Sequence, residues 1–265
     1  MNAEHSTANI LEEIYGPAGY STAFRIDADE LTFFRDAISA QWITRIEAAH
    51  PEHAAQFREA GLEQYHALSH LVSHSDLWPK EARVLSREAV ATLSDFKFVR
   101  RLRSHFGADC RISDVTFFSE SVAGYPEVYW RLVRPGVKTD VGGMHTDRWF
   151  HDILGDGAPL FSDDETTIKM WLPIFTEPGR NGLYVVPGSH RKDWTVKYTP
   201  GSDGFPRPAL DEALDDDARV LLPVEPGQAI LFNENLLHGG AVNAGSTSRV
   251  SIEITFVLKR VMVPQ

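Results

Sequence analysis

Eight short segments with the composition of β-strands follow one another after Gly107, and no helical stretch lies between them. They are rich in aromatic and β-branched residues and are separated by Gly, Pro, Asn and Asp. The segments span residues 110–118, 127–135, 142–150, 167–175, 182–188, 218–224, 228–233 and 249–258. So many short strands without interleaved helices predict a sandwich, a barrel or a jelly roll.

The part of the chain before these strands has the apolar spacing of helices. Its first stretch repeats apolar residues every three or four positions, and Asp27 or Asp29 is available as an N-cap. Two further helical stretches are expected over residues 52–71 and 86–106, and Gly107 is placed to end the last one.

The length of 265 residues favours one domain. Hydrophobic and charged contents of 43% and 24% are those of an ordinary globular protein. We therefore expect a single domain over residues 1–265, mostly β with N-terminal helices. Residues 1–107 would form a helical support region and residues 108–265 the catalytic core.

Candidate metal ligands lie within the segment VGGMHTDRWF. If this segment is a strand, His145 and Asp147 project to the same side, because side chains alternate between the two faces of a strand. His238, in the segment LLHGG, can supply a third ligand. Two histidines and one carboxylate form the facial triad of non-heme Fe(II) oxygenases, which leaves coordination positions open. The triplet alone is weak support in a chain with eleven histidines.

A carboxylate-binding pair is expected on the last strand. Its alternation places Arg249 and Ser251 on one face, next to the strand that carries His238. A guanidinium group binds a carboxylate through two parallel hydrogen bonds, and a hydroxyl can add a third. A metal site with a separate carboxylate clamp suits a dicarboxylate cosubstrate whose other end chelates iron.

The spacing of these residues resembles that of the Fe(II)/2-oxoglutarate oxygenases, in the phytanoyl-CoA hydroxylase-like branch. The pattern is His-x-Asp, a gap of roughly ninety residues, His, and Arg about eleven residues later. Between the ligands, KMWLPI and NGLYVVPGSH are similar to motifs of that branch, and the likeness covers about residues 110–260. It implies a double-stranded β-helix, the cupin-like jelly roll, with the helical region packed on the outer face of one sheet.

The resemblance also implies roles for the candidate residues. His145, Asp147 and His238 would hold Fe(II), and Arg249 with Ser251 would bind the distal carboxylate of 2-oxoglutarate. With O2, such an enzyme oxidises an unactivated carbon and releases succinate and CO2. Related halogenases have a small residue in place of the carboxylate, so Asp147 favours hydroxylation.

Four further residues are candidates for contact with the cosubstrate. Trp171 occupies a position where the family often has a tryptophan beside 2-oxoglutarate, although a tryptophan of the core explains it equally well. Lys169 lies two residues before Trp171 and would project to the same face of the strand, although an exposed lysine is the ordinary expectation. Tyr129 and Arg131 share a face of the strand before the metal motif.

Residues directly after the metal motif are candidates for substrate binding. Arg148, Trp149 and His151 would make the mouth polar and aromatic, which favours a polar small molecule, anionic or sugar-like, over a fatty acyl chain. An acyl-CoA or a nucleic acid would require a basic surface, whereas the net charge is −11.

Two other classes of function remain open. One is a cupin-type isomerase or dioxygenase that uses the metal without 2-oxoglutarate. The other is a non-catalytic jelly-roll protein that binds carbohydrate. Arg249 and Ser251 favour the 2-oxoglutarate enzyme, because a site that needs only a metal has no use for a remote carboxylate clamp.

The sequence gives few signs of location. The single Cys110 excludes an internal disulfide and suits a reducing cytosol, where we expect it to be a small buried hydrophobe. No targeting segment and no apolar run long enough to span a bilayer is present. We therefore expect a cytoplasmic protein with a small-molecule substrate, and the sequence leaves open whether it forms a homo-oligomer.

Overall fold

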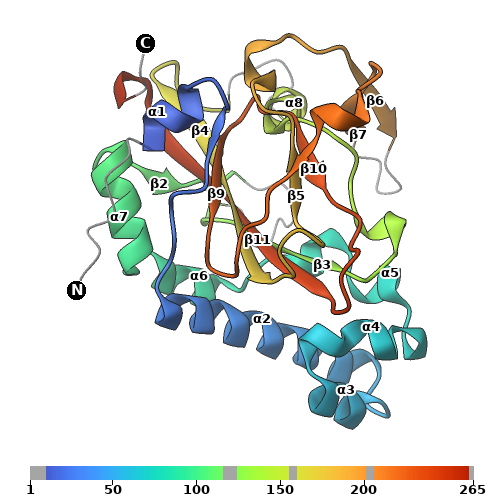
Figure 1. Ribbon diagram of the computed structural model, residues 1–265. Coiled ribbons are helices and arrows are strands. Elements are labelled where there is room, and N and C mark those ends of the chain that lie inside the picture. The colour runs from blue at the N-terminus through green and yellow to red at the C-terminus, as the bar shows by residue number, and fades with distance from the viewer. Residues whose placement is uncertain (1–9, 116–123, 155–159, 201–205, 263–265) are drawn as a thin grey trace, which may run out of the picture.

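A computed structural model describes residues 10–115, 124–154, 160–200 and 206–262 (Figure 1). Within these ranges the largest element is a six-stranded sheet in the order β1-β9-β4-β11-β2, with β3 also paired to β11. The strands are β1 (Tyr20–Ser21), β2 (Arg111–Ile112), β3 (Val128–Val133), β4 (Glu165–Phe175), β9 (Ile230–Asn233) and β11 (Arg249–Lys259). All of these pairs are antiparallel.

A smaller sheet faces this one. It has the order β10-β5-β8, formed by His238–Gly240, Leu183–Val185 and Val220–Leu221. Buried side chains of both sheets meet between them, among them Trp171 and Phe232 from the larger sheet and Val185 from the smaller. This is the two-sheet arrangement that the run of short strands predicted.

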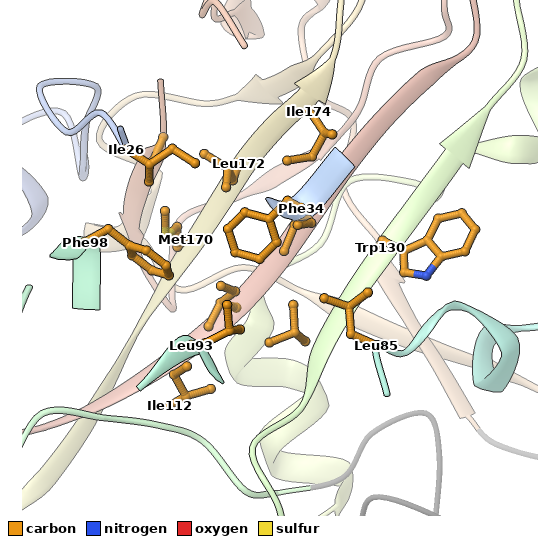
Figure 2. Close-up of a cluster of buried hydrophobic side chains, with 14 of the residues drawn as sticks. Ile26, Phe34, Leu85, Leu93, Phe98, Ile112, Trp130, Met170, Leu172 and Ile174 are labelled. Carbon is orange, nitrogen blue, oxygen red and sulfur yellow. The ribbon is translucent and has the colours of Figure 1, made fainter. Parts of the chain in front are cut away.

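The alternation along β11 separates an apolar outer face from a polar inner face. Val250, Ile252 and Ile254 are fully buried in one cluster with side chains of the N-terminal helices, as expected. Figure 2 shows this cluster, in which Phe34 and Leu172 lie on the same side of the larger sheet. The inner face is therefore left to charged and polar residues.

The N-terminal helices form a layer on that outer face (Figure 1). They are α1 (Ile10–Tyr15), α2 (Ala28–Ala49), α3 (Ala54–Ala60), α4 (Tyr65–Leu68), α5 (His74–Leu77), α6 (Arg87–Leu93) and α7 (Lys97–Phe106). Within the described ranges the 3₁₀ turns are η1 (Leu62–Gln64), η2 (Ser69–Leu71), η3 (Lys80–Arg83), η5 (Lys138–Asp140), η6 (Ser189–Arg191), η7 (Asp216–Ala218) and η8 (Arg260–Met262).

Helix boundaries follow from local chemistry. Asp27 is the N-cap of α2, and its amide donates to the Glu30 carboxylate at 2.9 Å. The stretch 52–71 is not one helix, because Gly61 adopts a φ of 76° and ends α3. The stretch 86–106 is not one helix either, because it is divided into α6 and α7. The Glu30 carboxylate accepts a hydrogen bond from the amide of Phe98, near the start of α7, at 2.8 Å. Gly107 ends α7 with a φ of 97°, as predicted.

Two predictions about the β region are wrong. Residues 142–150 do not form a strand: α8 (Asp147–Leu154) begins there, supported by an ion pair of 2.8 Å between Arg148 and Asp152 one helical turn apart. Residues 194–217, where none of the eight predicted strands lies, contain a hairpin of β6 (Val196–Pro200) and β7 (Pro206–Leu210).

Two further stretches can be compared only in part. The predicted strand 110–118 is represented by β2, and residues 116–118 lie outside the described ranges. Residues 155–159, in the segment that connects the predicted strands 142–150 and 167–175, also lie outside the described ranges. Cys110 is buried, and burial raises the pKa of its thiol to about 12, which agrees with a structural role.

Within the described ranges no helix is both long and apolar enough to cross a membrane.

His74 provides a test of the packing between the helical layer and the core. Its Nδ1 lies 3.0 Å from the hydroxyl of Tyr65, and its Nε2 lies 3.7 Å from the Asp140 carboxylate. Burial lowers the pKa of His74 to about 4, against the attraction of Asp140, and the side chain is only 17% exposed.

We predict that the free energy of unfolding falls by up to about 3 kcal/mol between pH 6.5 and pH 4 through this residue alone. The unfolded state binds the proton at the ordinary histidine pKa, whereas folded His74 resists it, so acid favours unfolding. Urea unfolding across this range measures the effect, with His74→Gln as the control that lacks it. Identical pH dependence in the two proteins would contradict the prediction.

Candidate metal centre and active site

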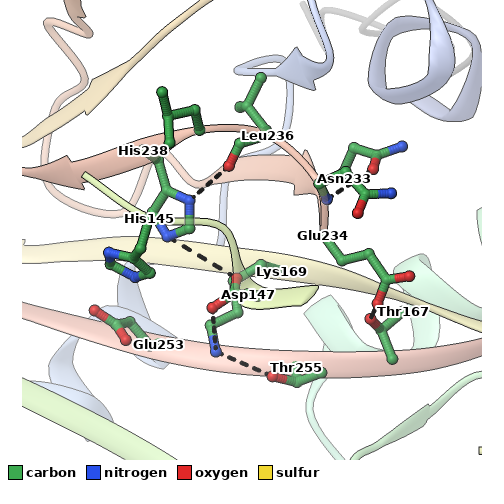
Figure 3. Close-up of polar contacts among 12 residues, drawn as sticks. His145, Asp147, Thr167, Lys169, Asn233, Glu234, Leu236, His238, Glu253 and Thr255 are labelled. Carbon is green, nitrogen blue, oxygen red and sulfur yellow. Dashed lines mark hydrogen bonds and ion pairs between the residues drawn. The ribbon is translucent and has the colours of Figure 1, made fainter. Parts of the chain in front are cut away.

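Three side chains that are candidate metal ligands meet between the two sheets. One ligand atom from each of His145, Asp147 and His238 lies within 4.8 Å of the others. The two imidazole rings are 4.5 Å apart, and Asp147 Oδ2 lies 3.9 Å from His238 Nε2 (Figure 3). The sequence prediction that these three residues converge therefore agrees with the geometry, although Asp147 stands at the start of a helix.

Backbone hydrogen bonds fix both histidines. The amide of each donates to the carbonyl of the other at 2.9 Å, in an isolated antiparallel bridge. Each ring places its Nδ1 against a carbonyl, at 2.8 Å from Gly143 for His145 and 2.9 Å from Leu236 for His238. A proton on Nδ1 is then held by the carbonyl, which leaves the Nε2 lone pair free to bind a metal.

The electrostatics of the three residues match those of a metal site. Burial lowers the pKa of His145 to about 4, and the neighbouring His238 adds to the effect. Burial alone would raise the pKa of Asp147, but Lys169 and the histidines more than offset it and lower it to about 2. At neutral pH the site thus holds a neutral His145 and an ionised Asp147, the states that bind metals.

Asp147 also has an unused acceptor atom. Its Oδ2 is buried, and the described part of the chain offers it no hydrogen-bond donor. Because a buried polar atom without a partner is costly, this oxygen indicates a missing ligand. A divalent cation between the carboxylate and the two imidazoles fits the donor set of two histidines and one carboxylate.

Arg249 and Ser251 also have buried polar atoms that form no hydrogen bond within the described ranges. Arg249 is 1% exposed and donates to the carbonyl of Gly182, while its Nε and the Ser251 hydroxyl are buried with no partner in the described ranges. Burial, with the nearby Arg131, lowers the pKa of Arg249 to about 10. A carboxylate would satisfy both groups and the charge, so the pair fits the distal end of a dicarboxylate.

The position of Arg249 differs in one respect from the expectation. Its strand β11 is hydrogen-bonded to β3 and β4, whereas the strand that carries His238 belongs to the facing sheet. Arg249 approaches that strand across the interior, and its Nη2 would lie 3.5 Å from a Cβ at Gly240. Arg249 and the candidate metal ligands therefore face each other across the space between the sheets.

A narrow cavity runs from the two candidate histidine ligands to Arg249. Its lining includes His145, His238, Trp171, Arg131 and Arg249. Trp171 is 2% exposed and its ring lies 5.9 Å from the Arg249 guanidinium carbon, so it belongs both to the core and to the cavity wall.

The other three cosubstrate candidates also lie on the inner side of the larger sheet. Arg131 forms an ion pair with Glu253, and its guanidinium carbon lies 5.2 Å from the centre of the buried Tyr129 ring. Lys169 is half-buried, with Nζ 3.1 Å from the Thr255 hydroxyl and 3.8 Å from Asp147. Direct contact of Tyr129, Arg131 and Lys169 with a cosubstrate stays a prediction.

Glu253 also lines the narrow cavity and is not among the residues predicted from the sequence. Burial would raise the pKa of Glu253, but Arg131 and Lys169 more than offset it and lower it to about 2. The alternation along β11 could have predicted its position, because Glu253 projects to the same face of the strand as Arg249 and Ser251.

The expected substrate residues occupy α8. Trp149 is buried against Val186 and Leu237, and His151 is buried with Nδ1 3.1 Å from the Glu234 carboxylate. Arg148 is exposed. His151 and Arg148 line a hollow that none of the three candidate metal ligands lines, while a separate cavity of about 350 Å³ is lined by His145 and Asp147. Contact of these three residues with a substrate stays a prediction.

Comparison with known proteins adds a family match. Residues 31–251 match the model of the family described as phytanoyl-CoA dioxygenase. Among curated proteins, none matches the sequence significantly.

Several solved structures have a similar fold. The apo form of ThoJ, a non-heme monooxygenase, has a TM-score of 0.54 and 13% identity, over 94% of this chain and 77% of that one. SnoK, a non-heme α-ketoglutarate-dependent carbocyclase from nogalamycin biosynthesis, has a TM-score of 0.52 and 15% identity, over 97% and 86%. EctD from S. alaskensis, in its apo form, has a TM-score of 0.50 and 17% identity, over 97% and 78%. These likenesses confirm the predicted jelly roll with N-terminal helices.

We predict that Asp147→Ala and His238→Ala each lower the affinity for Fe(II) by at least about a hundredfold, because each removes one of three ligands. Loss of a residue that only hydrogen-bonds a metal ligand already costs about 10- to 100-fold in affinity. Anaerobic equilibrium dialysis with Fe(II) measures the affinity. Glu59→Ala, which removes an exposed carboxylate from α3, is the control and should bind iron like the parent. Parental affinity in Asp147→Ala would remove Asp147 from the ligand set.

Proposed function

Because the chain belongs to the phytanoyl-CoA dioxygenase family, we propose that it hydroxylates an unactivated carbon of a polar small molecule, sugar-like or anionic. The reaction would consume O2 and 2-oxoglutarate and release succinate and CO2. The observation that carries the proposal is that both histidines of the His-Asp-His cluster line one narrow cavity with a buried, incompletely satisfied arginine.

Its cofactors are Fe(II) and 2-oxoglutarate, as the sequence resemblance implied. His145, Asp147 and His238 would hold the iron on one side, which leaves room for the cosubstrate and O2. Iron and 2-oxoglutarate together supply the oxidising chemistry when they are bound, and the protein supplies position and surroundings.

The residues of this chain then have distinct tasks. Arg249 and Ser251 would anchor the distal carboxylate of the cosubstrate and so fix which end reaches the metal. The buried Trp171 would close one wall of the cavity and keep water out. Lys169, 3.8 Å from Asp147, helps to keep that carboxylate ionised and ready to bind a cation.

The alternatives have less support. A metal-only isomerase or dioxygenase has no need for a fully buried guanidinium group that lacks part of its hydrogen bonding. A carbohydrate-binding module has no need for two imidazoles held 4.5 Å apart beside an ionised carboxylate. The carboxylate at Asp147 also favours hydroxylation over halogenation, because it fills a position at the metal that a halide would require.

We predict that Arg249→Ala weakens the binding of 2-oxoglutarate by roughly a hundredfold or more. Loss of one partner of a buried ion pair costs on the order of 3–5 kcal/mol, and about 1.4 kcal/mol corresponds to a factor of ten. Arg249→Lys should recover only part of the affinity, because an ammonium group is a point charge without two parallel donors.

Anaerobic isothermal titration of the iron-loaded protein with 2-oxoglutarate measures this difference. Iron affinity serves as the internal control, since Arg249 is not a ligand and both variants should bind Fe(II) like the parent. If Arg249→Ala binds 2-oxoglutarate as tightly as the parent, the carboxylate clamp lies elsewhere, and Arg131 or Lys169 is the next candidate.

A further inference from the structure

The cavity of about 350 Å³ beside the metal ligands is unusually basic for this protein. Five basic side chains line it against three acidic ones, in a chain whose net charge is −11. The basic residues are Lys80, Arg83, Arg131, Lys169 and Arg207, and the acidic ones are Asp140, Asp147 and Glu253. They come from the helical region, the larger sheet and the β6–β7 hairpin, so the fold gathers positive charge here from distant parts of the chain.

The acidic residues of this cavity already have partners. Glu253 pairs with Arg131, and Asp140 accepts from the Arg134 guanidinium at 2.8 and 2.9 Å. Asp147 is a candidate metal ligand. Glu253 and Asp140 attract the charge of Arg83 from a distance, but within the described ranges none of the three carboxylates forms an ion pair with it.

Arg83 itself is incompletely satisfied. Its guanidinium carbon lies 5.1 Å from the centre of the Tyr129 ring. The Nε atom is buried, and no acceptor for it exists within the described ranges. A buried cationic donor without an acceptor is costly, and this cost would be relieved by an anion that enters the cavity.

The backbone around Arg83 is firmly held. The side-chain amide of Gln41 donates to the carbonyls of Ala82 and Val84, at 3.1 and 2.7 Å, and its oxygen accepts from the indole of Trp130 at 3.2 Å. Val84 also forms a bridge with Tyr129 at the edge of the larger sheet. Arg83 is thus positioned before any ligand arrives, which lowers the entropic cost of binding.

This basic cavity is distinct from the narrow cavity of the cosubstrate. Both are lined by His145, Arg131 and Glu253, so the Arg131–Glu253 pair forms part of a common wall. Arg249 lines only the narrow cavity, whereas Arg83 lines only the basic one. The site therefore has two cationic positions, one on each side of that wall.

We propose that Arg83 binds an anionic group of the primary substrate, a carboxylate, phosphate or sulfate on a small molecule. Lys80 and Arg207 line the same cavity and add to the attraction. The assignment rests on the proposed function, and it gives a physical basis for an anionic substrate. An anion held at Arg83 would place the rest of a small molecule in the space lined by His145 and Asp147, where oxidation would occur. The volume suits a small metabolite.

Inorganic sulfate is a suitable probe, because it carries the proposed charge and has no carbon to be oxidised. It is titrated calorimetrically, without oxygen and at constant ionic strength, into protein loaded with Fe(II) and 2-oxoglutarate. Arg83→Met keeps the aliphatic stem and should weaken sulfate binding about tenfold or more. Arg83→Lys should lie between the two, and Arg100→Met, which removes an exposed arginine on α7, should match the parent. All variants should bind 2-oxoglutarate within about twofold of the parent.

Two results would overturn the assignment: parental sulfate affinity in Arg83→Met, or a loss of 2-oxoglutarate affinity there, which would place Arg83 in the cosubstrate site. If thermal melting shows that Arg83→Met does not fold, Arg207→Gln on the hairpin tests the same cavity and should also weaken sulfate binding. The two proposals fail separately. If sulfate binding depends on Arg83 but the protein does not bind 2-oxoglutarate, only the proposed function is refuted. If the protein binds 2-oxoglutarate but sulfate binding does not depend on Arg83, only this assignment is refuted.

Discussion

The two reciprocal backbone hydrogen bonds between His145 and His238 are the contact on which the site depends. They join the segment before α8 to the strand β10, at 2.9 Å in each direction. This bridge sets the separation of the two imidazoles, and the adjacent carbonyls of Gly143 and Leu236 set their orientation. Asp147 follows two residues after His145, so the same bridge also brings the carboxylate to the rings.

The polar interior is possible because the outer faces of the sheet are so well packed. Along β11, every second residue is buried against the helices, and the residues between them project into the space between the sheets. There Arg131 and Glu253 neutralise each other, while Arg249 and Asp147 each keep a buried atom that no described residue satisfies. In a region of low polarity, such atoms favour charged ligands strongly. The incomplete hydrogen bonding of these residues thus indicates where a cation and an anion would bind.

Much of this arrangement could be predicted from local patterns, and the rest could not. Alternation on the last strand predicted the inner position of Arg249, and the motif spacing predicted the candidate metal ligands that the fold brings together. The strand expected around Asp147 was wrong because the His-x-Asp pattern fits both a strand and a turn into a helix, and the Arg148–Asp152 pair favours the helix. The role of Arg83 could not be predicted from the sequence. Arg83 reaches the cavity because the next residue, Val84, pairs with Tyr129 of β3, and no local pattern encodes such a long-range contact.

The central claim is that the His-Asp-His cluster and the arginine clamp together bind one chelating cosubstrate. Anaerobic addition of Fe(II) and then 2-oxoglutarate to the purified protein tests it most directly. We predict a weak visible charge-transfer band that requires both additions, because only the chelate on iron produces it. Iron binding without any band on addition of 2-oxoglutarate would contradict the account, and it would leave a metal site that works without this cosubstrate.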